Sequence, residues 1–320
     1  MLIQEPTKQN IIDAHRLIKR HVHHTPIMSS RSINTYLGCK IYFKCENLQK
    51  IGAFKLRGAI NAVFTLSKVA LLKGVATHSS GNHAAAVAYA AHLRNIPAYI
   101  VMPKNSSAVK ISAVEGYGAE IIFCEPNLNS REEELAKIVK KTGAMFIPPY
   151  DSYSIIAGQA TCAKEIVEEL SELDFLIVPV GGGGLLSGTG LAAKYFSPKV
   201  KVIGAEPRGA DDAARSFKDG VIHPSVNPQT VCDGLLTQLS EKTFSIIKTT
   251  VSEIITAEEV SIIESMRTIW ERMKMIIEPS AAVSLAVILE NKLKFSGKKI
   301  GVVLSGGNVD LEKLPWNVKA

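Results

Sequence analysis

Short apolar runs rich in Val and Ile recur along most of the chain, separated by longer stretches in which apolar residues have a helical spacing. Most of the short runs are apolar throughout and do not alternate with polar residues, which is typical of strands buried on both faces of a parallel sheet. The pattern therefore predicts mostly parallel β-structure. The predicted strands are Ile41–Cys45, Val75–His78, Ala98–Met102, Glu120–Cys124, Met145–Pro148, Asp174–Val180, Val200–Ala205 and Lys299–Leu304.

Helices are predicted between these strands. Apolar residues recur every three or four positions from Ile11 to Val22, which predicts one face of a first helix. Ser130 and Glu133 have the spacing of a capping box and predict the start of another helix. The stretch Ser280–Leu289 is apolar almost all round, so we expect this helix in the core. Strands that alternate with helices in this way indicate an α/β fold with doubly wound layers.

Length and charge narrow the class of protein. The chain has 320 residues, which favours about two domains. Its formal net charge is +7, but acidic residues are interleaved with basic ones and no aromatic–basic platform is present. We therefore expect no nucleic-acid partner, and we interpret the charge as a surface that attracts anionic small molecules. No membrane partner is expected either, because no apolar run approaches the roughly 18 residues of a spanning helix.

Cysteine usage indicates the compartment. The five cysteines are scattered and never have C-x-x-C spacing, and the N-terminal residues lack the basic start and apolar run of a secretory signal. These features predict a cytoplasmic, reducing location without disulfides or a thiolate zinc site.

A run of glycines at 181–184 directly follows the predicted strand Asp174–Val180 and precedes an Ala/Leu-rich helix. Glycines let the backbone approach a ligand closely, and a helix N-terminus offers unpaired N–H groups to an anion. The run therefore predicts a site for a phosphate monoester, with a tight strand-to-helix turn as the alternative. It is not a Walker loop, because no Gly-Lys-Ser/Thr follows, and it matches the dinucleotide-binding pattern poorly.

Three further segments carry polar groups suited to a ligand. Lys55 lies among apolar residues and opens a predicted helix, which suits a buried neutral amine that can form a Schiff base. The segments Ser79–His83 and Ser305–Asn308 each follow a predicted strand, and ligands of α/β proteins bind beyond the carboxyl ends of strands. Taken alone, Lys55 is better explained as a surface lysine, and Ser79–His83 equally well as a helix cap. Together with the glycine run, these segments indicate one ligand site.

In order and spacing, from about Thr25 to Asp310, these motifs resemble the serine racemase and serine/threonine dehydratase family of fold-type II pyridoxal-phosphate (PLP) enzymes. The resemblance implies a tryptophan synthase β-like fold of two doubly wound α/β domains with mostly parallel sheets. Residues 1–69 and 149–320 would form a large PLP-binding domain. Residues 70–148 would form a small mobile substrate-binding domain that closes over the cofactor and excludes water. A homodimer is also expected.

The resemblance assigns roles around the cofactor. Lys55 would carry PLP and act as a base on one face of Cα, Asn82 would bind the ring hydroxyl, and Ser305 would meet the pyridine nitrogen. A neutral serine there makes the ring a weaker electron sink, which disfavours transamination but leaves β-elimination and proton exchange available. The expected cofactor-binding residues are Phe54, Lys55, Asn82, Gly181, Gly182, Gly183, Gly184, Leu185 and Ser305.

Ser80 is implied to be the second catalytic residue. Racemases of the family carry serine at this position and many dehydratases carry alanine, and a hydroxyl opposite the lysine can move the Cα proton on the other face. Some 3-hydroxyaspartate dehydratases also carry serine, so elimination stays open. Arg131 matches a family arginine near the substrate side chain, and an exposed residue in a helix's first turn is a competing explanation. The expected substrate-binding residues are Ser79, Ser80, Gly81, Asn82, His83 and Arg131.

The segment 206–212 resembles the divalent-metal loop of the family. Glu206 and Asp212 would supply carboxylate oxygens and Ala210 its carbonyl, a set that suits Mg²⁺, Ca²⁺ or Mn²⁺. Without the resemblance, this segment would be interpreted as a solvated acidic loop.

The predicted function is PLP-dependent racemisation or dehydration (an ammonia-lyase reaction) of a small β-hydroxy amino acid. L-Serine is the first candidate, followed by L-threonine and 3-hydroxyaspartate. The alternatives are a dedicated threonine or threo-3-hydroxyaspartate dehydratase, a cysteine synthase-like sulfhydrylase and a non-catalytic ligand-binding protein. A nicotinamide enzyme is disfavoured because the dinucleotide fingerprint and its acidic ribose partner are missing.

Overall fold

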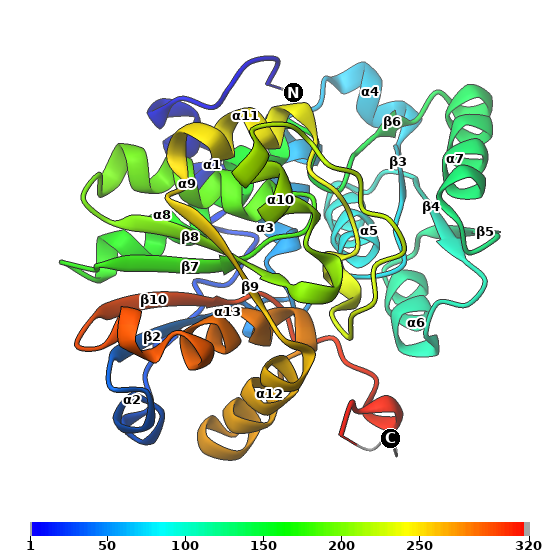
Figure 1. Ribbon diagram of the computed structural model, residues 1–320. Helices are drawn as coiled ribbons and strands as arrows, with labels where there is room; N and C mark the ends of the chain where they lie inside the picture. The colour runs from blue at the N-terminus through cyan, green and yellow to red at the C-terminus, as the bar shows by residue number, and fades with distance from the viewer. Residues whose placement is uncertain (1, 317–320) are drawn as a thin grey trace.

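The computed structural model describes residues 2–316, which form two sheets flanked by helices (Figure 1). The larger sheet has the strand order β1-β2-β10-β7-β8-β9, and the smaller has the order β5-β4-β3-β6. All pairings are parallel except that of β1 with β2. The strands are β1 (Ile27–Met28), β2 (Lys40–Cys45), β3 (Val75–His78), β4 (Ala98–Pro103), β5 (Glu120–Cys124), β6 (Met145–Phe146), β7 (Phe175–Pro179), β8 (Lys201–Pro207), β9 (Glu253–Ala257) and β10 (Lys299–Leu304).

Helices occupy most of the connections between strands, and the described residues also form the short 3₁₀ turns η1 (Glu46–Leu48), η2 (Arg208–Ala210), η3 (Asp233–Leu235) and η4 (Leu311–Lys313). The α-helices are α1 (Lys8–Ile18), α2 (Arg31–Leu37), α3 (Lys55–Phe64), α4 (Lys68–Lys73), α5 (Asn82–Arg94), α6 (Ala108–Gly116), α7 (Leu128–Thr142), α8 (Tyr153–Glu169), α9 (Gly184–Phe196), α10 (Asp212–Asp219), α11 (Glu241–Thr250), α12 (Glu259–Met273), α13 (Pro279–Glu290) and α14 (Lys292–Phe295).

Helices cover both faces of each sheet. In Figure 1, α8 and α9 lie above the larger sheet with α1 and α11, whereas α13, α12 and α2 lie below it. On the smaller sheet, α5 packs against one face and α7 against the other. Helix α13 is buried from Pro279 to Ile288, as expected for a helix that is apolar almost all round. The doubly wound α/β prediction is therefore confirmed. No helix within residues 2–316 combines the length and apolar character that a membrane span requires.

The sequence pattern did not predict two of the strands, and it predicted one strand as too long. β1 has only two residues, and β9 is a partly buried edge strand with no continuous apolar run. The strand predicted at Met145–Pro148 ends at Phe146, because Pro148 and Pro149 have no N–H to continue the pairing.

The capping box predicted at Ser130 and Glu133 is wrong. Helix α7 begins earlier, because the side chain of Asn127 accepts the Ser130 backbone N–H at 2.8 Å and caps the first turn. The Ser130 hydroxyl accepts the backbone N–H of Glu125 at 3.1 Å. At the other end of the chain, α1 ends at Ile18, so the buried Val22 lies beyond the helix whose face it was expected to share.

Candidate active site

Three polar loops leave the sheets where strands end, and we call them the strand-end loops. Ser79–His83 follows β3, the glycine run at 181–184 follows β7, and Ser305–Asn308 follows β10. β7 and β10 are neighbouring parallel strands, so their loops leave the same edge of the larger sheet. Ser79–His83 joins them from the smaller sheet, because the Asn82 side chain bonds to the Asn308 side chain.

Lys55 is anchored at this edge as the first residue of α3. The backbone N–H of Phe54 donates to the carbonyl oxygen of Ser305 (3.0 Å), and Ala53 forms an isolated β-bridge with Gly306. The Lys55 ammonium donates to the carbonyl oxygen of Pro149 at 2.9 Å. The end of β10 therefore determines where the amine lies.

The Lys55 side chain is partly buried, and this changes its acidity. Loss of water around the ammonium lowers the pKa of Lys55 from 10.5 to about 8, and the nearby Glu278 carboxylate opposes the shift. A substantial neutral fraction is therefore present near physiological pH, as a nucleophilic or proton-accepting lysine requires.

His83 is neutral and holds its loop in place. Burial, followed by the nearby Lys55 cation, lowers the pKa of His83 to about 3. The neutral ring donates through Nε2 to the carbonyl oxygen of Ile147 at 3.0 Å. The imidazole therefore anchors the Ser79–His83 loop to the chain just beyond β6.

The Ser79–His83 loop presents the start of α5. The Gly81 backbone N–H donates to the Ser79 hydroxyl at 3.2 Å, and no side chain caps the helix. Ser80 is partly buried in the bend between β3 and α5. The Lys110 ammonium of α6 lies 3.5 Å from the position that a Cβ on Gly81 would take, and it forms an ion pair with Asp233 of η3. An uncapped helix start beside a cation suits a carboxylate.

Asn82 is held by two residues from the far end of the chain. Its amide nitrogen donates to both carboxylate oxygens of Glu278, at 2.8 and 3.2 Å. Its amide oxygen accepts from the side-chain nitrogen of Asn308 at 2.9 Å. Ser305, at the start of the same loop as Asn308, is 3% exposed.

The glycine run has the shape of a phosphate cradle. Gly183 has a φ of +86°, which disfavours any residue with a side chain, and α9 begins directly after it without a side-chain cap. A Cβ on Gly182 would overlap the Tyr150 ring, and one on Gly183 would lie 2.8 Å from the side chains of Leu239 and Thr243. Leu185, in the first turn of α9, is buried. These residues fit the phosphate of PLP, because only glycines leave the helix N–H groups uncovered.

Arg131 lies in the first turn of α7 and is only partly exposed. Its Nε is buried and has no hydrogen-bond partner among residues 2–316. Burial, followed by the Arg131 cation, lowers the pKa of His78, the last residue of β3, so the guanidinium lies close to the Ser79–His83 loop. This environment differs from the freely solvated surface position that was the competing explanation.

The expected metal ligands lie where β8 meets α10. The Glu206 carboxylate accepts the backbone N–H groups of Ala213 (2.9 Å) and Ala214 (2.8 Å), and Ala210 is buried in η2. Asp212 is 1% exposed, and its Oδ2 has no hydrogen-bond partner in the described part of the chain. No group of three or more His, Cys, Asp or Glu suited to a metal occurs among residues 2–316. The expected set has only two carboxylates plus a carbonyl, and the orphaned buried oxygen of Asp212 fits a cation.

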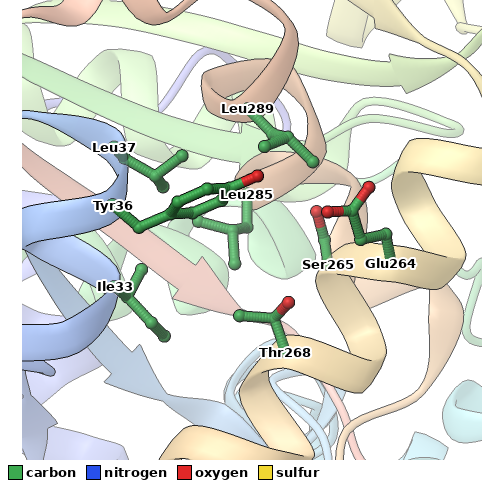
Figure 2. Close-up of a pocket in the computed structure, with 8 residues that line it drawn as sticks. All are labelled: Ile33, Tyr36, Leu37, Glu264, Ser265, Thr268, Leu285 and Leu289. Atoms are coloured by element: carbon green, nitrogen blue, oxygen red, sulfur yellow. The ribbon is translucent and has the colours of Figure 1, made fainter.

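A separate small hollow lies under the larger sheet, between α2, α12 and α13 (Figure 2). Its volume is about 10 Å³, enough for about one water molecule. None of its lining residues belongs to the strand-end loops, so it is not the candidate site. They are Ile33, Tyr36, Leu37, Glu264, Ser265, Thr268, Leu285 and Leu289.

Sequence reasoning missed three residues at the site: Glu278, Lys110 and Asp233. Glu278 precedes Pro279 at the start of α13 and has the sequence context of an ordinary helix N-terminus. Lys110 stands between Val109 and Ile111, and Asp233 follows Cys232, so each is a single charged residue in a mostly apolar stretch. No local pattern marks any of them, because their partners lie more than a hundred residues away in sequence.

Comparison with known proteins relates this geometry to a family. A sequence model described as pyridoxal-phosphate dependent enzyme matches residues 18–306. The β-hydroxyaspartate dehydratase of Paracoccus denitrificans is 50% identical over 312 residues, which cover 98% of this chain and 99% of the relative. The L-threo-3-hydroxyaspartate ammonia-lyase of Saccharomyces cerevisiae is 47% identical, over 96% of this chain and 95% of the relative.

Solved structures of serine racemases are also similar to this chain. The crystal structure of serine racemase from Dictyostelium discoideum matches with a TM-score of 0.91 at 46% identity, over 95% of this chain and 99% of that chain. Maize serine racemase matches with a TM-score of 0.95 at 43% identity, over 98% of this chain and 97% of that chain. The family match spans Lys55 and all three loops as far as Gly306. This chain therefore belongs to the pyridoxal-phosphate-dependent enzymes, as its resemblance to serine racemases and serine/threonine dehydratases predicted.

Proposed function

We propose that this protein is a PLP-dependent racemase and ammonia-lyase of small β-hydroxy amino acids. L-Serine would be converted to D-serine and to pyruvate plus ammonia, and L-threonine and 3-hydroxyaspartate are further candidate substrates. The observation that carries the proposal is the place of Lys55, an amine of lowered pKa at the sheet edge where the strand-end loops meet. Relatives named serine racemase and 3-hydroxyaspartate ammonia-lyase support this choice of chemistry.

Residues of all three loops would hold the cofactor. The glycine run and Leu185 at the start of α9 suit the phosphate, Asn82 suits the ring hydroxyl, and Ser305 suits the pyridine nitrogen. The Lys55 ammonium lies over the Phe54 ring, 5.4 Å from its centroid. When bound, PLP withdraws electrons from Cα of the amino acid and so acidifies the Cα proton.

Two residues of this chain would then move that proton. Neutral Lys55 would accept it on one face of Cα, and its lowered pKa makes the neutral amine available near pH 8. Ser80, in the loop of the smaller sheet, would deliver or accept a proton on the opposite face. Racemisation requires both residues, whereas elimination requires Lys55 and a proton donor for the departing hydroxyl.

The substrate carboxylate would bind to Ser79, Ser80, Gly81, Asn82 and His83 at the uncapped start of α5. Arg131 would face the substrate side chain. Its buried, unpartnered Nε favours a second candidate, a dedicated 3-hydroxyaspartate dehydratase, because a β-carboxylate would satisfy the guanidinium.

We also infer how the domains, the oligomer and the metal site are organised. Residues 70–148, which contain the smaller sheet, form a small mobile domain that closes over the site, and residues 1–69 and 149–320 form the large domain. The contacts of Asn82 with Glu278 and of Lys110 with Asp233 would be two of the links made on closure. The protein would act as a cytoplasmic homodimer, and its five buried, unpaired cysteines suit a reducing compartment. Glu206, Ala210 and Asp212 would bind a divalent cation.

Parallel assays of the two products test the proposal. The PLP-loaded enzyme is incubated with L-serine, L-threonine and the threo and erythro forms of 3-hydroxyaspartate, and keto acid and D-amino acid are measured together. We expect both products from L-serine. Cysteine formation from O-acetylserine and sulfide that outruns keto-acid release would instead indicate a sulfhydrylase. Protein that stays colourless after addition of PLP would indicate a non-catalytic binding protein.

The Ser80→Ala variant separates the two activities. We expect racemisation of L-serine to fall by roughly 100-fold or more, because one of the two proton-transferring groups is lost, while elimination falls by less than about tenfold. Ser79→Ala is the matched control, since it removes the neighbouring hydroxyl and should lower both activities to the same extent. Equal losses in Ser80→Ala would contradict the assigned role.

A further inference from the structure

Glu278 is a buried carboxylate in the site that the proposed reaction does not yet use. It precedes α13 and is 4% exposed. Burying a carboxylate is costly unless it is paired or hydrogen-bonded. Burial, followed by the nearby Asp233 carboxylate, raises the pKa of Glu278 to about 7, and both of its oxygens accept from the Asn82 amide nitrogen, at 2.8 and 3.2 Å. The carboxylate is therefore committed to one side-chain partner.

Asn308 holds Asn82 from the other side. Its amide nitrogen donates both to the Asn82 oxygen (2.9 Å) and to the carbonyl oxygen of Ile51 (2.8 Å), which uses both of its hydrogens. The Asn308 amide oxygen points at Gly52, where a Cβ would lie 2.5 Å away. Asn308 therefore has one orientation, and the Asn82 oxygen must face it.

These two contacts determine how the Asn82 amide is turned. The Asn308 amide nitrogen only donates hydrogen bonds, so the oxygen of Asn82 must face it, and this turns the nitrogen of Asn82 toward Glu278. Gly306 packs directly beneath: a Cβ there would lie 2.5 Å from Oε1 of Glu278 and 3.1 Å from the Asn82 nitrogen. A flipped amide would lose both of its hydrogen bonds to the Glu278 oxygens and the one from Asn308.

We propose that Glu278 is the positioning residue for Asn82: by accepting from its amide nitrogen, it holds the amide in the orientation in which Asn82 meets the cofactor. The inference rests on the proposed contact between Asn82 and the cofactor ring hydroxyl. Glu278 also places a negative charge near the Lys55 amine, which supports a place for Glu278 within the cofactor site.

A double-mutant cycle on cofactor affinity tests this inference. PLP binding to the apo-protein is measured by equilibrium dialysis, and the visible absorption maximum is recorded for each loaded variant. Glu278→Ala should weaken PLP binding by roughly 10- to 100-fold, the size expected for losing a hydrogen bond to a charged group. In an Asn82→Ala background the same change should weaken it by less than about threefold, because the partner that Glu278 orients is already gone.

Three further variants guard against a purely structural loss. Glu278→Gln keeps an acceptor oxygen and should restore affinity to within about threefold of the parent, with the parental absorption maximum. Glu278→Met keeps the bulk without an acceptor and carries the test if Glu278→Ala does not fold. Glu290→Ala, at the exposed far end of α13, is the matched control and should leave affinity unchanged.

The outcomes separate this inference from the proposed function. If Asn82→Ala weakens PLP binding but Glu278→Ala and Glu278→Met do not, the inference fails and the proposed cofactor contact stands. Losses that add fully in the double mutant would also overturn it, since Glu278 would then act independently of Asn82. If Asn82→Ala has no effect on PLP binding, both the contact and the inference are overturned.

Discussion

Burial sets the protonation states of two neighbouring side chains, Lys55 and His83. Each is a base that loses solvation, so the pKa of each is lowered, and each is therefore neutral over part or all of the physiological range. The consequences differ because the surroundings differ. His83 donates to a backbone carbonyl and becomes a structural anchor, whereas Lys55 stays beside the strand-end loops as a titratable amine.

The lowered pKa of Lys55 predicts a pH dependence for cofactor uptake. Only the neutral amine attacks an aldehyde, so the rate constant for PLP uptake by the apo-protein should rise about tenfold per pH unit below pH 8 and level off above it. Stopped-flow absorbance at several pH values measures this rate. A rate that continues to climb towards pH 10.5, the ordinary value for lysine, would show that burial does not shift this amine.

The lowered pKa of Lys55 also predicts that the stability of the apo-protein changes between about pH 8 and 10.5. Between about pH 8 and 10.5 the folded apo-protein binds fewer protons at Lys55 than the unfolded chain does. The contribution of this group to the free energy of unfolding therefore rises with pH over that window.

At the scale of the element, the strand–glycine–helix unit of β7 and α9 shows how a local motif depends on its surroundings. Four consecutive glycines predict a ligand-binding turn, and the positive φ of Gly183 explains one of them from backbone geometry alone. The need for glycine at 182 comes from Tyr150, which packs against the run from another segment. The sequence motif can therefore be recognised locally, whereas the packing that requires glycine at 182 comes from the tertiary structure.

Gly183→Ala tests the cradle, with Gly220→Ala as its matched control. Both glycines have positive φ, +86° and +75°, so both substitutions should cost about 1 kcal/mol in backbone strain. A Cβ added at Gly183 would lie 2.8 Å from the side chains of Leu239 and Thr243. A Cβ added at Gly220 would have no atom within 4 Å. We expect Gly183→Ala alone to lose a further roughly 1–3 kcal/mol of stability and at least tenfold in PLP affinity. Chemical denaturation and PLP titration of the two variants provide the comparison, and equal behaviour would rule out the cradle.

At the scale of the whole molecule, the site is assembled from three distant regions of the chain. These regions meet where β3, β7 and β10 end, and they are the residues near 55, the smaller sheet around 75–146 and the C-terminal half. The expected metal loop lies at the end of β8 in the same larger sheet, and a cation there would stabilise the junction of β8 with α10.

Metal binding at this junction should raise the thermal stability of the whole protein. With Mg²⁺ or Ca²⁺ well above its Kd, we expect Tm to rise by roughly 2–5 °C, and EDTA should reverse the rise. Asp212→Asn should abolish the response, because the buried unpartnered oxygen is replaced by a poor ligand. Asp211→Asn is the control: this half-exposed residue pairs with Arg215 and is not an expected ligand. A cation response that survives in Asp212→Asn would place the metal elsewhere.

The sequence alone determined the layered α/β architecture, the eight main strands and the four motifs, because each leaves a local pattern: a continuous apolar run, a glycine cluster, or a lysine between glycines. It did not predict the edge strand β9, because a partly buried strand leaves no such pattern. It also placed the start of α7 too late, because Asn127 caps this helix and Ser130 does not.

Only the tertiary structure decided which polar groups face one another. Asn82 and Glu278 are 196 residues apart, and Lys110 and Asp233 are 123 residues apart. Sequence spacing shows which side chains share one helix or one strand. The partners of a buried charge, and therefore its pKa and its role, depend on how distant elements pack together.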